Sequence, residues 1–325
     1  MRFTTMRFLK SLVLIASAVS IPLVPQIGFA QDFPSKRVSM VVPFAAGGGT
    51  DLAARVIAER LSERWKQPVI VENRPGAGGL IGTAAVAKSP ADGYTILFNS
   101  TGFTLAAVFN KDVPFDPLNA LKGAAVISAP LFLFASPSMP DSVKDFMRVA
   151  QQKPKAVSYG VIPFSSMAVD MRLFEEQLKA EMLEVPLNSA VPAVTMLITG
   201  ELNLWTSFWG PMADLVKAGK AKPLGIASAQ RSKYAPSVPT FIENGLDYKV
   251  DTWFALFVPA KTPQSILERI STDAALAVRS PEAEARLTQL GLEAYTLSPS
   301  ETESAIQSLY KKYKFAADRF GIQPR

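Results

Sequence analysis

The stretch that decides the fold is VVPFAAGGGTD, residues 41–51. An apolar run, which predicts a buried strand over 38–43, leads into three consecutive glycines. Residues 50–67 then place their apolar side chains on one stripe, which predicts an amphipathic helix with Thr50 as its N-cap. Backbone N–H groups at such a turn, together with the helix N-terminus, form a concavity that attracts anions. We therefore expect an anion site here; the alternative is that the glycines only permit a tight turn.

The pattern of strand, glycine loop and helix repeats downstream. PVIVENRPGAGG (68–79) predicts a second strand and a second glycine loop, LIGTAAVAKS (80–89) a second helix, and the residues after Asp92-Gly93 a third strand. Strands that alternate with helices indicate a parallel α/β sheet. No low-complexity linker interrupts the chain, so we expect two domains that share a continuous interface. Further strands are predicted at 124–128, 131–136, 156–160, 183–187, 202–206, 223–229 and 253–258, and helices at 281–290, with Ser280 as N-cap and Gly291 past the end, and at 300–320.

The composition excludes several kinds of chemistry. The 325 residues include no cysteine and no histidine. Thiolate nucleophiles, disulfides and cysteine-ligated zinc are therefore excluded, and so is the commonest general base and metal ligand. We predict no catalytic residues, no metal site and no cofactor.

The N-terminus has the pattern of a secretory signal peptide over residues 1–30. Arg2, Arg7 and Lys10 precede an apolar run, and Gly28 and Ala30 occupy the small-residue positions before a cleavage site. An uncleaved membrane anchor is the alternative, but the run is short for a spanning helix. Cleavage removes three positive charges and no acid, so the net charge falls from +6 to +3. A charge this small predicts no nucleic-acid partner.

Three anions compete for the glycine turn. A nucleotide triphosphate needs a lysine and a hydroxyl directly after the glycines, whereas Gly49 is followed by Thr50 and Asp51. The second loop, GAGGLIG, approaches the dinucleotide-binding spacing, but a lone glycine fingerprint is a weak signal. A carboxylate fits the first loop best, because small residues allow close approach to the main chain. Asp51 then holds the loop by accepting backbone hydrogen bonds.

These residues carry a family resemblance. The order of PFAAGGGTD, VENRPGAGG and PADGYT within residues 33–98, and WFALFVPAKTP at 253–263, resembles the substrate-binding proteins of tripartite tricarboxylate transporters, the Bug family. The resemblance covers the chain after residue 30 and is weakest over 156–210. It implies an α/β fold of the type II periplasmic binding protein class, with two α/β domains and a ligand cleft between them. Residues 31–131 plus 254–325 would form the first domain, and 132–253 the second.

The resemblance also implies a function. Such proteins are periplasmic solute receptors that bind a small organic carboxylate and deliver it to the permease subunits of a membrane transporter. We expect a monomer that is not an enzyme. Two alternatives stay open: an α/β enzyme that binds a cofactor at the glycine loops, and a carboxylate-sensing receptor without a transport role.

Carried over residue by residue, the resemblance predicts a substrate-binding site. Arg74 is either a loop clamp or a carboxylate partner, and we favour the clamp. Ser165 and Ser166 bind ligand or cap a helix. The predicted contacts are Phe44, Ala45, Ala46, Gly47, Gly48, Thr50, Asp51, Asn99, Ser100 and Thr101 from the first domain, and Phe164, Ser165, Ser166, Asn188, Ser207 and Phe208 from the second.

The second domain departs from the family pattern. Ala168, Asn188 and Ser207 stand where the family commonly has histidine, lysine and aspartate. The far end of the pocket therefore has fewer charges, while Phe164, Phe208 and Trp209 offer apolar surface. We hypothesise a ligand with one carboxylate and an apolar or aromatic body. The competing interpretation is that the aromatic residues are core and that hydroxyl and amide groups bind a dicarboxylate.

Overall fold

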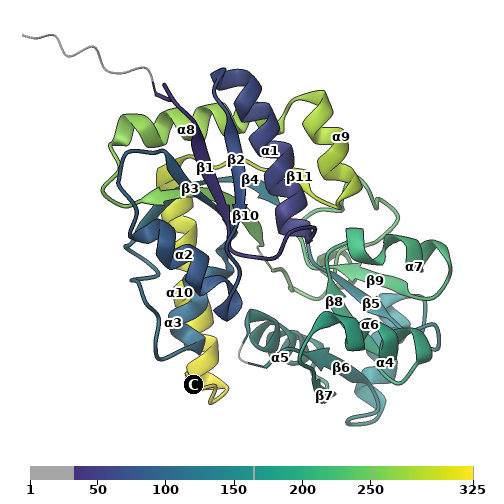
Figure 1. Ribbon diagram of the computed structural model, residues 1–325. Coiled ribbons are helices and arrows are strands. Elements are labelled where there is room, and N and C mark those ends of the chain that lie inside the picture. The colour runs from purple at the N-terminus through teal and green to yellow at the C-terminus, as the bar shows by residue number, and fades with distance from the viewer. Residues whose placement is uncertain (1–32, 164, 251, 325) are drawn as a thin grey trace, which may run out of the picture. The chain divides into compact units, whose positions relative to one another are not determined.

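The computed structural model describes residues 33–163, 165–250 and 252–324. The predicted signal peptide at 1–30 and the predicted contact residue Phe164 lie outside the described residues, as does the side chain of Thr101. Figure 1 shows the arrangement of the described helices and strands around two β-sheets.

The first sheet contains six of the described strands in the order β11-β4-β10-β3-β1-β2. The predicted parallel pairing is confirmed for β1 with β2 and with β3. It is wrong for β10, which runs antiparallel to both β3 and β4. The reason is topological: the chain leaves this sheet after β4, builds the second sheet, and returns in the opposite direction as β10. The strands are β1 (Val38–Val42), β2 (Val69–Asn73), β3 (Thr95–Ser100), β4 (Leu121–Ser128), β10 (Trp253–Pro259) and β11 (Glu293–Ala294).

The second sheet has five of the described strands in the order β7-β6-β8-β5-β9. Here β6 pairs in parallel with β7 and β8, and β5 is the antiparallel strand between β8 and β9. The first sheet thus has two strands, β10 and β11, that run against its parallel set, and the second sheet has one, β5. This mixed α/β architecture confirms the predicted fold class. Every predicted strand is present, whereas the two-residue β11 is too short to show a period. The strands are β5 (Phe132–Ala135), β6 (Ser158–Val161), β7 (Leu183–Pro186), β8 (Leu204–Ser207) and β9 (Lys222–Ile226).

Helix boundaries follow local capping chemistry. The Ser280 side chain accepts a hydrogen bond from the Ala283 N–H at the start of α9, as predicted. The expected cap at Thr50 is wrong, because Gly48 is the extended residue before α1 and Thr50 lies inside its first turn. The helices are α1 (Gly49–Trp65), α2 (Leu80–Ala87), α3 (Ala106–Phe109), α4 (Val143–Gln152), α5 (Ser166–Leu178), α6 (Ala190–Thr199), α7 (Ala213–Lys217), α8 (Gln264–Val278), α9 (Pro281–Gln289) and α10 (Pro299–Arg319).

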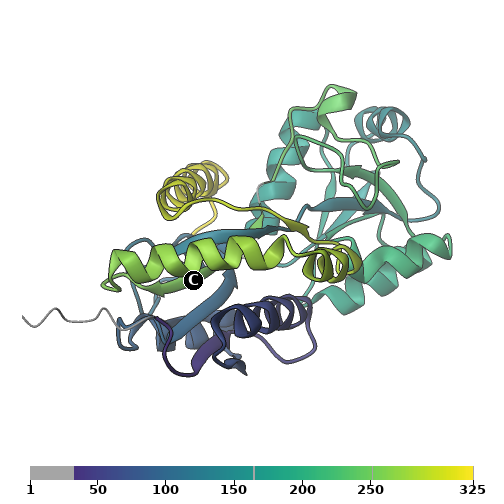
Figure 2. The ribbon, with the colours of Figure 1, turned by 90° about the horizontal axis from the view of Figure 1, so that it is seen from above.

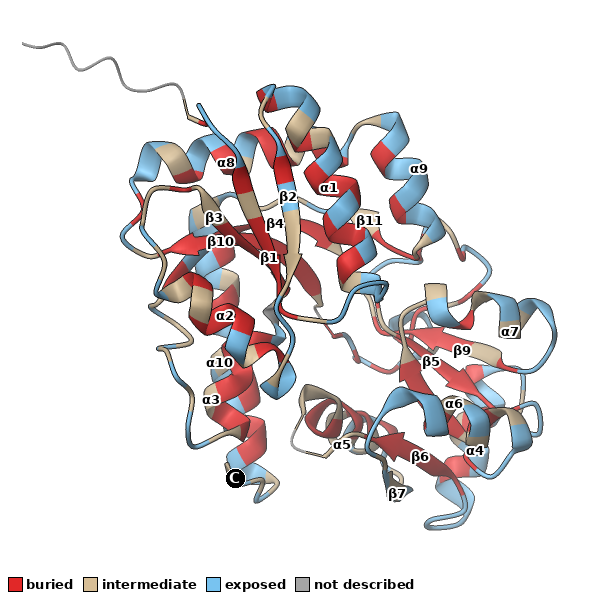
Figure 3. Cartoon of the chain, in the orientation of Figure 1, coloured by how far each residue is buried: buried red, intermediate tan, exposed pale blue. Residues whose placement is uncertain are grey.

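Alternate residues of each central strand enter different cores. In β10, Phe254 and Leu256 pack with α1, α8 and α9, whereas Ala255 and Phe257 pack on the other face with α2 and α10. Figure 2 shows α10 on the opposite side of this sheet from α1, and Figure 3 shows the strands buried beneath both helix layers. Because both faces are covered, the strands are near-continuous apolar runs rather than alternating ones.

The two sheets are joined by paired chain crossings. The Ala129 N–H, just after β4, donates to the Thr252 carbonyl just before β10 at 2.9 Å. The Leu131 carbonyl accepts from the Ala227 N–H at 2.8 Å. Residues Phe33–Arg325 form one compact unit. We propose that the predicted domains correspond to the two sheets with their helices; their exact boundaries stay a prediction.

A buried polar contact also links helices that cover different sheets. Asp170 of α5 is 3% exposed and accepts a hydrogen bond from the Tyr313 hydroxyl of α10. Burial raises the pKa of Asp170 from 3.8 to about 7, although the Tyr313 hydrogen bond and the charge of Lys312 oppose this rise. The carboxyl group therefore holds its proton over a wider pH range in the folded chain than in the unfolded chain.

This proton gives a prediction for stability against pH. Between about pH 4 and pH 7 the folded chain binds more protons at Asp170 than the unfolded chain, so the free energy of unfolding falls as pH rises through this window. Asp170→Asn cannot titrate, so its stability relative to wild type should improve from pH 5 to pH 8. Urea unfolding at the two pH values measures this, with the exposed Asp214→Asn as control. Parallel pH profiles for wild type and Asp170→Asn would contradict the assignment.

Candidate functional site

The first glycine loop is held by the carboxylate of Asp51. This side chain is 1% exposed. One of its oxygens accepts from the Gly47 N–H and from Arg55 Nε, both at 2.9 Å, and the other accepts from Asn73 Nδ2 at 2.9 Å. The same Asn73 amide donates to the Phe44 carbonyl at 3.1 Å. Asp51 therefore fixes the path of the loop, as the sequence predicts.

The charge state of Asp51 follows from these contacts. Burial would raise its pKa, but the hydrogen bonds from Arg55, Gly47 and Asn73 outweigh burial and hold the pKa below its ordinary value. The carboxylate is ionised at neutral pH, and the Arg55 guanidinium neutralises it locally. Arg74 pairs with Glu72 at 2.9 Å and is exposed, which agrees with a clamp on the strand end.

The second glycine loop lies directly against the first. A Cβ atom on Gly79 would lie 3.3 Å from the Phe44 ring, and one on Gly82 would lie 2.9 Å from Pro43 Cβ. Glycine is therefore required at Gly82 by close packing. Ala77, Gly78 and Gly79 all have positive φ, at 46°, 64° and 95°. Successive residues of this conformation turn backbone N–H groups toward one concave side, and of these the Gly79 N–H donates to the Gly76 carbonyl at 2.9 Å.

A cavity of about 690 Å³ opens beside these loops. It is bordered by elements of both sheets: the two glycine loops, the end of β3, the 3₁₀ helix Thr101–Leu105, α3, and the turn that leads into α5. A cavity of this size suits a small ligand. Its lining residues are Phe44, Ala77, Gly78, Leu80, Asn99, Ser100, Gly102, Phe103, Ala106, Phe109, Asn110, Asp112, Ile162, Pro163, Ser165 and Ser166.

Five of the predicted contacts line this cavity: Phe44, Asn99, Ser100, Ser165 and Ser166. Asn99 is buried; its amide donates to Thr83 Oγ1 at 3.2 Å and its carbonyl oxygen accepts from the Ser100 N–H at 2.8 Å. Ser165 occupies the N-cap position of α5, but its hydroxyl donates to the Ile162 carbonyl and makes no cap bond.

Other predicted contacts lie elsewhere. Ala45, Ala46, Gly47 and Gly48 form the exposed rim of the first loop, Thr50 is half-buried in the first turn of α1, and Asn188 is exposed before α6. Ser207 ends β8. None of these residues is among the described residues that line the cavity.

The two aromatic residues after β8 pack against core residues. The Phe208 ring lies 6.4 Å from that of Phe254, and it packs on the core of the first sheet. The Trp209 ring lies 5.1 Å from that of Phe132 and 6.2 Å from that of Tyr234. These contacts favour the interpretation of both residues as core.

Sequence reasoning missed most of the apolar lining. Phe103, Ala106 and Phe109 follow Thr101 on two consecutive short helices, and Ile162 precedes α5. The sequence gives little sign that these residues line a cavity, because short apolar stretches of this kind are usual in any protein core. The second glycine loop, whose spacing approaches that of a dinucleotide-binding loop, instead contributes Ala77 and Gly78 to the cavity lining.

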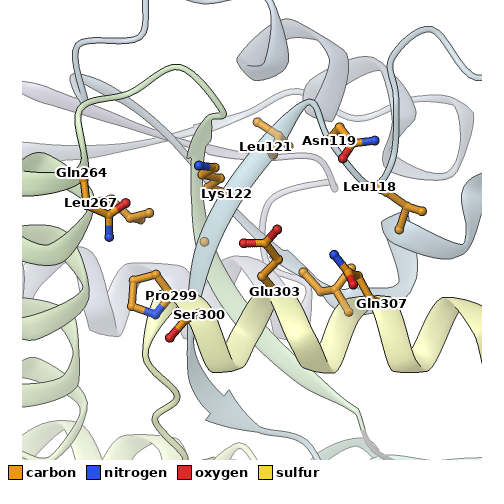
Figure 4. A pocket seen from close by; sticks show the side chains of 12 residues that line it. Leu118, Asn119, Leu121, Lys122, Gln264, Leu267, Pro299, Ser300, Glu303 and Gln307 are labelled. Atoms are coloured by element: carbon orange, nitrogen blue, oxygen red, sulfur yellow. The ribbon is translucent and has the colours of Figure 1, made fainter.

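A smaller pocket of about 180 Å³ lies among β4, α8 and α10, all of which belong to the first sheet and its helices. Figure 4 shows Lys122 of β4 and Glu303 of α10 at this hollow. It contains none of the predicted contacts. Across the described residues, acidic side chains form no group that could hold a metal ion. No described helix has the length and apolar character needed to cross a membrane.

Comparisons with known proteins point to one family. The family model described as "Tripartite tricarboxylate transporter family receptor" matches residues 53–321. Protein BugT of Bordetella pertussis is 31% identical over 283 residues, which are 85% of this chain and 87% of BugT.

Solved structures agree with this assignment. R. palustris Rpa4515 with adipate is 31% identical, with a TM-score of 0.76 over 90% of this chain and 100% of that one. The periplasmic binding protein BugD is 26% identical, with a TM-score of 0.74 over 90% of this chain and 100% of that one. MatC (Rpa3494) from Rhodopseudomonas palustris with bound malate is 27% identical, with a TM-score of 0.70 over 87% and 99% of the two chains.

The first glycine loop gives a prediction that separates binding from folding. Gly48 has φ −75°, and a Cβ atom there would meet only the Ala45 carbonyl oxygen at 3.5 Å, an ordinary contact. Gly48→Val should therefore cost at most about 1 kcal/mol of stability. If the loop binds a carboxylate closely, the branched side chain should weaken binding by about tenfold or more, or roughly 1.4 kcal/mol.

Calorimetry and thermal unfolding of the same variant measure the two effects. Ser280→Val, which removes the N-cap of α9 away from the cavity, is a matched control that should lower stability but leave affinity unchanged. Unchanged affinity in a folded Gly48→Val protein would show that the ligand does not approach this loop.

Proposed function

Since the chain belongs to the tripartite tricarboxylate transporter receptor family, as the sequence predicts, we propose that it is a periplasmic receptor for a small organic carboxylate. The ligand binds in the cavity lined by Phe44, Asn99 and Ser166, and the protein delivers it to permease subunits in the membrane. The observation that carries this proposal is the cavity itself, because it brings two glycine loops together with residues of the second sheet. The adipate-bound and malate-bound neighbours support a carboxylate ligand.

The site has groups suited to an anion. The main-chain N–H groups of Ala77 and Gly78 and the N-terminus of α2 at Leu80 supply positive electrostatic potential at the cavity without a charged side chain. The Ser166 hydroxyl, which has no partner among the described residues, and the remaining N–H of the Asn99 amide add donors from the two sides of the cavity. One carboxylate has two oxygens that accept up to four such hydrogen bonds.

Catalysis is not part of the proposal. Among the described lining residues, Asp112 is the only titratable side chain, and it is exposed. The described lining offers it no second titratable side chain with which to form an acid–base pair. The related receptors bind their ligands, and we infer that this chain likewise retains its ligand unchanged as a monomer.

A panel of carboxylates tests the proposal by thermal shift. Mono-, di- and tricarboxylates, aliphatic and aromatic, should include at least one acid that stabilises the purified protein. At 100 times its dissociation constant, a ligand adds about 2.7 kcal/mol to the free energy of unfolding. Recovery of the acid unchanged after incubation would support a receptor, whereas its conversion to product would support the enzyme alternative. A panel without any stabilising acid would contradict a carboxylate receptor.

Processing of the N-terminus gives a separate prediction. If residues 1–30 are a signal peptide, the exported chain begins at Gln31, because Gly28 and Ala30 occupy the small-residue positions before the cleavage site. Intact-mass measurement of protein from the periplasmic fraction checks this. A mass that includes Met1 would instead favour the membrane-anchor alternative.

A further inference from the structure

The cavity carries an unusual distribution of charge for a site that takes acids. Its described lining includes no lysine and no arginine. Its one charged side chain is Asp112, which follows α3 and has no hydrogen-bond or ion-pair partner among the described residues. Lys111 is exposed beside it in the chain but does not line the cavity. The field of the lining side chains is therefore negative, and only main-chain and uncharged donors can attract an anion.

Much of the remaining wall is apolar. Leu80 follows the second glycine loop, Phe103 and Phe109 come from the two short helices after β3, and Ile162 comes from the second sheet's side. Both rings are more than nine-tenths buried, and the Phe103 ring is held edge-on against Phe257 at 4.9 Å. A fixed apolar wall of this kind favours the hydrocarbon part of a ligand.

The polar groups of the wall are partly occupied. The Ser165 hydroxyl donates to the Ile162 carbonyl, and Asn110 Nδ2 donates to the Ala106 carbonyl at 3.1 Å. The Ser100 hydroxyl oxygen accepts from the Gly102 N–H at 3.4 Å. The donors that remain, the hydroxyl hydrogens of Ser100 and Ser166 and the second N–H of the Asn99 and Asn110 amides, carry no charge. A second carboxylate would lie against apolar side chains or near Asp112, and burial without a partner is costly for a charged group.

We propose that this receptor selects acids with a single carboxylate and an apolar body, and that Asp112 is a specificity-determining residue that disfavours a second carboxylate. The inference rests on the proposed function, since it names the class of ligand for the same cavity. In this proposal the apolar body of the ligand contacts Leu80, Phe103, Phe109 and Ile162, and not the aromatic residues after β8.

Matched pairs of acids test this selectivity. Hexanoate and adipate share a six-carbon skeleton and differ by one carboxylate; butanoate with succinate, and benzoate with terephthalate, are pairs of the same kind. Calorimetry on the purified protein should show the monoacid of a pair binding about tenfold or more tightly than the diacid, because the second carboxylate would lie against apolar side chains or near Asp112. Equal or tighter binding of the diacid, or binding of citrate alone, would overturn the proposed class.

The role of Asp112 is tested by Asp112→Asn, which keeps the size of the side chain and removes its charge. Because Asp112 is exposed, its field is screened over about 8 Å at physiological salt, so we expect the diacid to gain only about threefold to tenfold. Affinity for the monoacid should gain less than affinity for the diacid, since the monoacid has one charge rather than two, and both gains should shrink as salt is added. Asp247→Asn removes an equal charge from an exposed position that does not line the cavity, and it should leave both affinities unchanged.

The outcomes separate this inference from the proposed function. An unchanged gap between monoacid and diacid in Asp112→Asn, or an equal gain in Asp247→Asn, would contradict a specific role for Asp112. Binding of any acid in these experiments leaves the receptor function standing. Failure of every acid in the pairs and in the wider panel would instead contradict the receptor function itself.

Discussion

The structure depends on the double crossing of the chain between its two sheets. β4 ends at Ser128 and β5 begins at Phe132, so only three residues connect the sheets on the outward path. The return path enters β10 at Trp253, and the Ala129–Thr252 hydrogen bond ties the two paths together. At this crossing β10 runs antiparallel between β3 and β4, and β5 runs antiparallel between β8 and β9. The cavity can form because these short crossings bring loops of both sheets to the same place.

Ligand binding near this crossing depends on how rigidly the first glycine loop is held before a ligand arrives. Asp51 is charged and buried, and such a group is tolerated only because several donors surround it. Its contacts order the first loop before any ligand arrives, and Phe44 in turn packs on Gly79 of the second loop. Donors held in place by other bonds lose little conformational entropy on binding, which favours affinity. The glycines supply main-chain access, and the aspartate supplies the rigidity that glycines lack.

The sequence predicted those features that depend on residues close together in the chain, and it missed those that depend on contacts between distant segments. Apolar periodicity predicted each long strand, since both sheets bury their strands on two faces. Strand direction carries no periodic signal, so the antiparallel course of β10 could not be read from the pattern. The site shows the same division: Asn99 and Ser166 were predicted through the family resemblance, and they lie at the end of β3 and the start of α5. The contribution of Phe103 and Phe109, and the packing of Phe208 on Phe254, depend on contacts between distant segments.

The cavity is also connected to the packing that supports it. Ser166 at the start of α5 lines the cavity, and Asp170, one turn later on the same helix, accepts the hydrogen bond from Tyr313 of α10. Phe109 lines the cavity and also belongs to the apolar cluster that contains Tyr313 and Val169. A ligand that contacts Ser166 and Phe109 therefore touches two elements already held against α10. The Asp170–Tyr313 hydrogen bond and the wall of the cavity therefore share one packing interface, so the same contacts with α10 hold both in place.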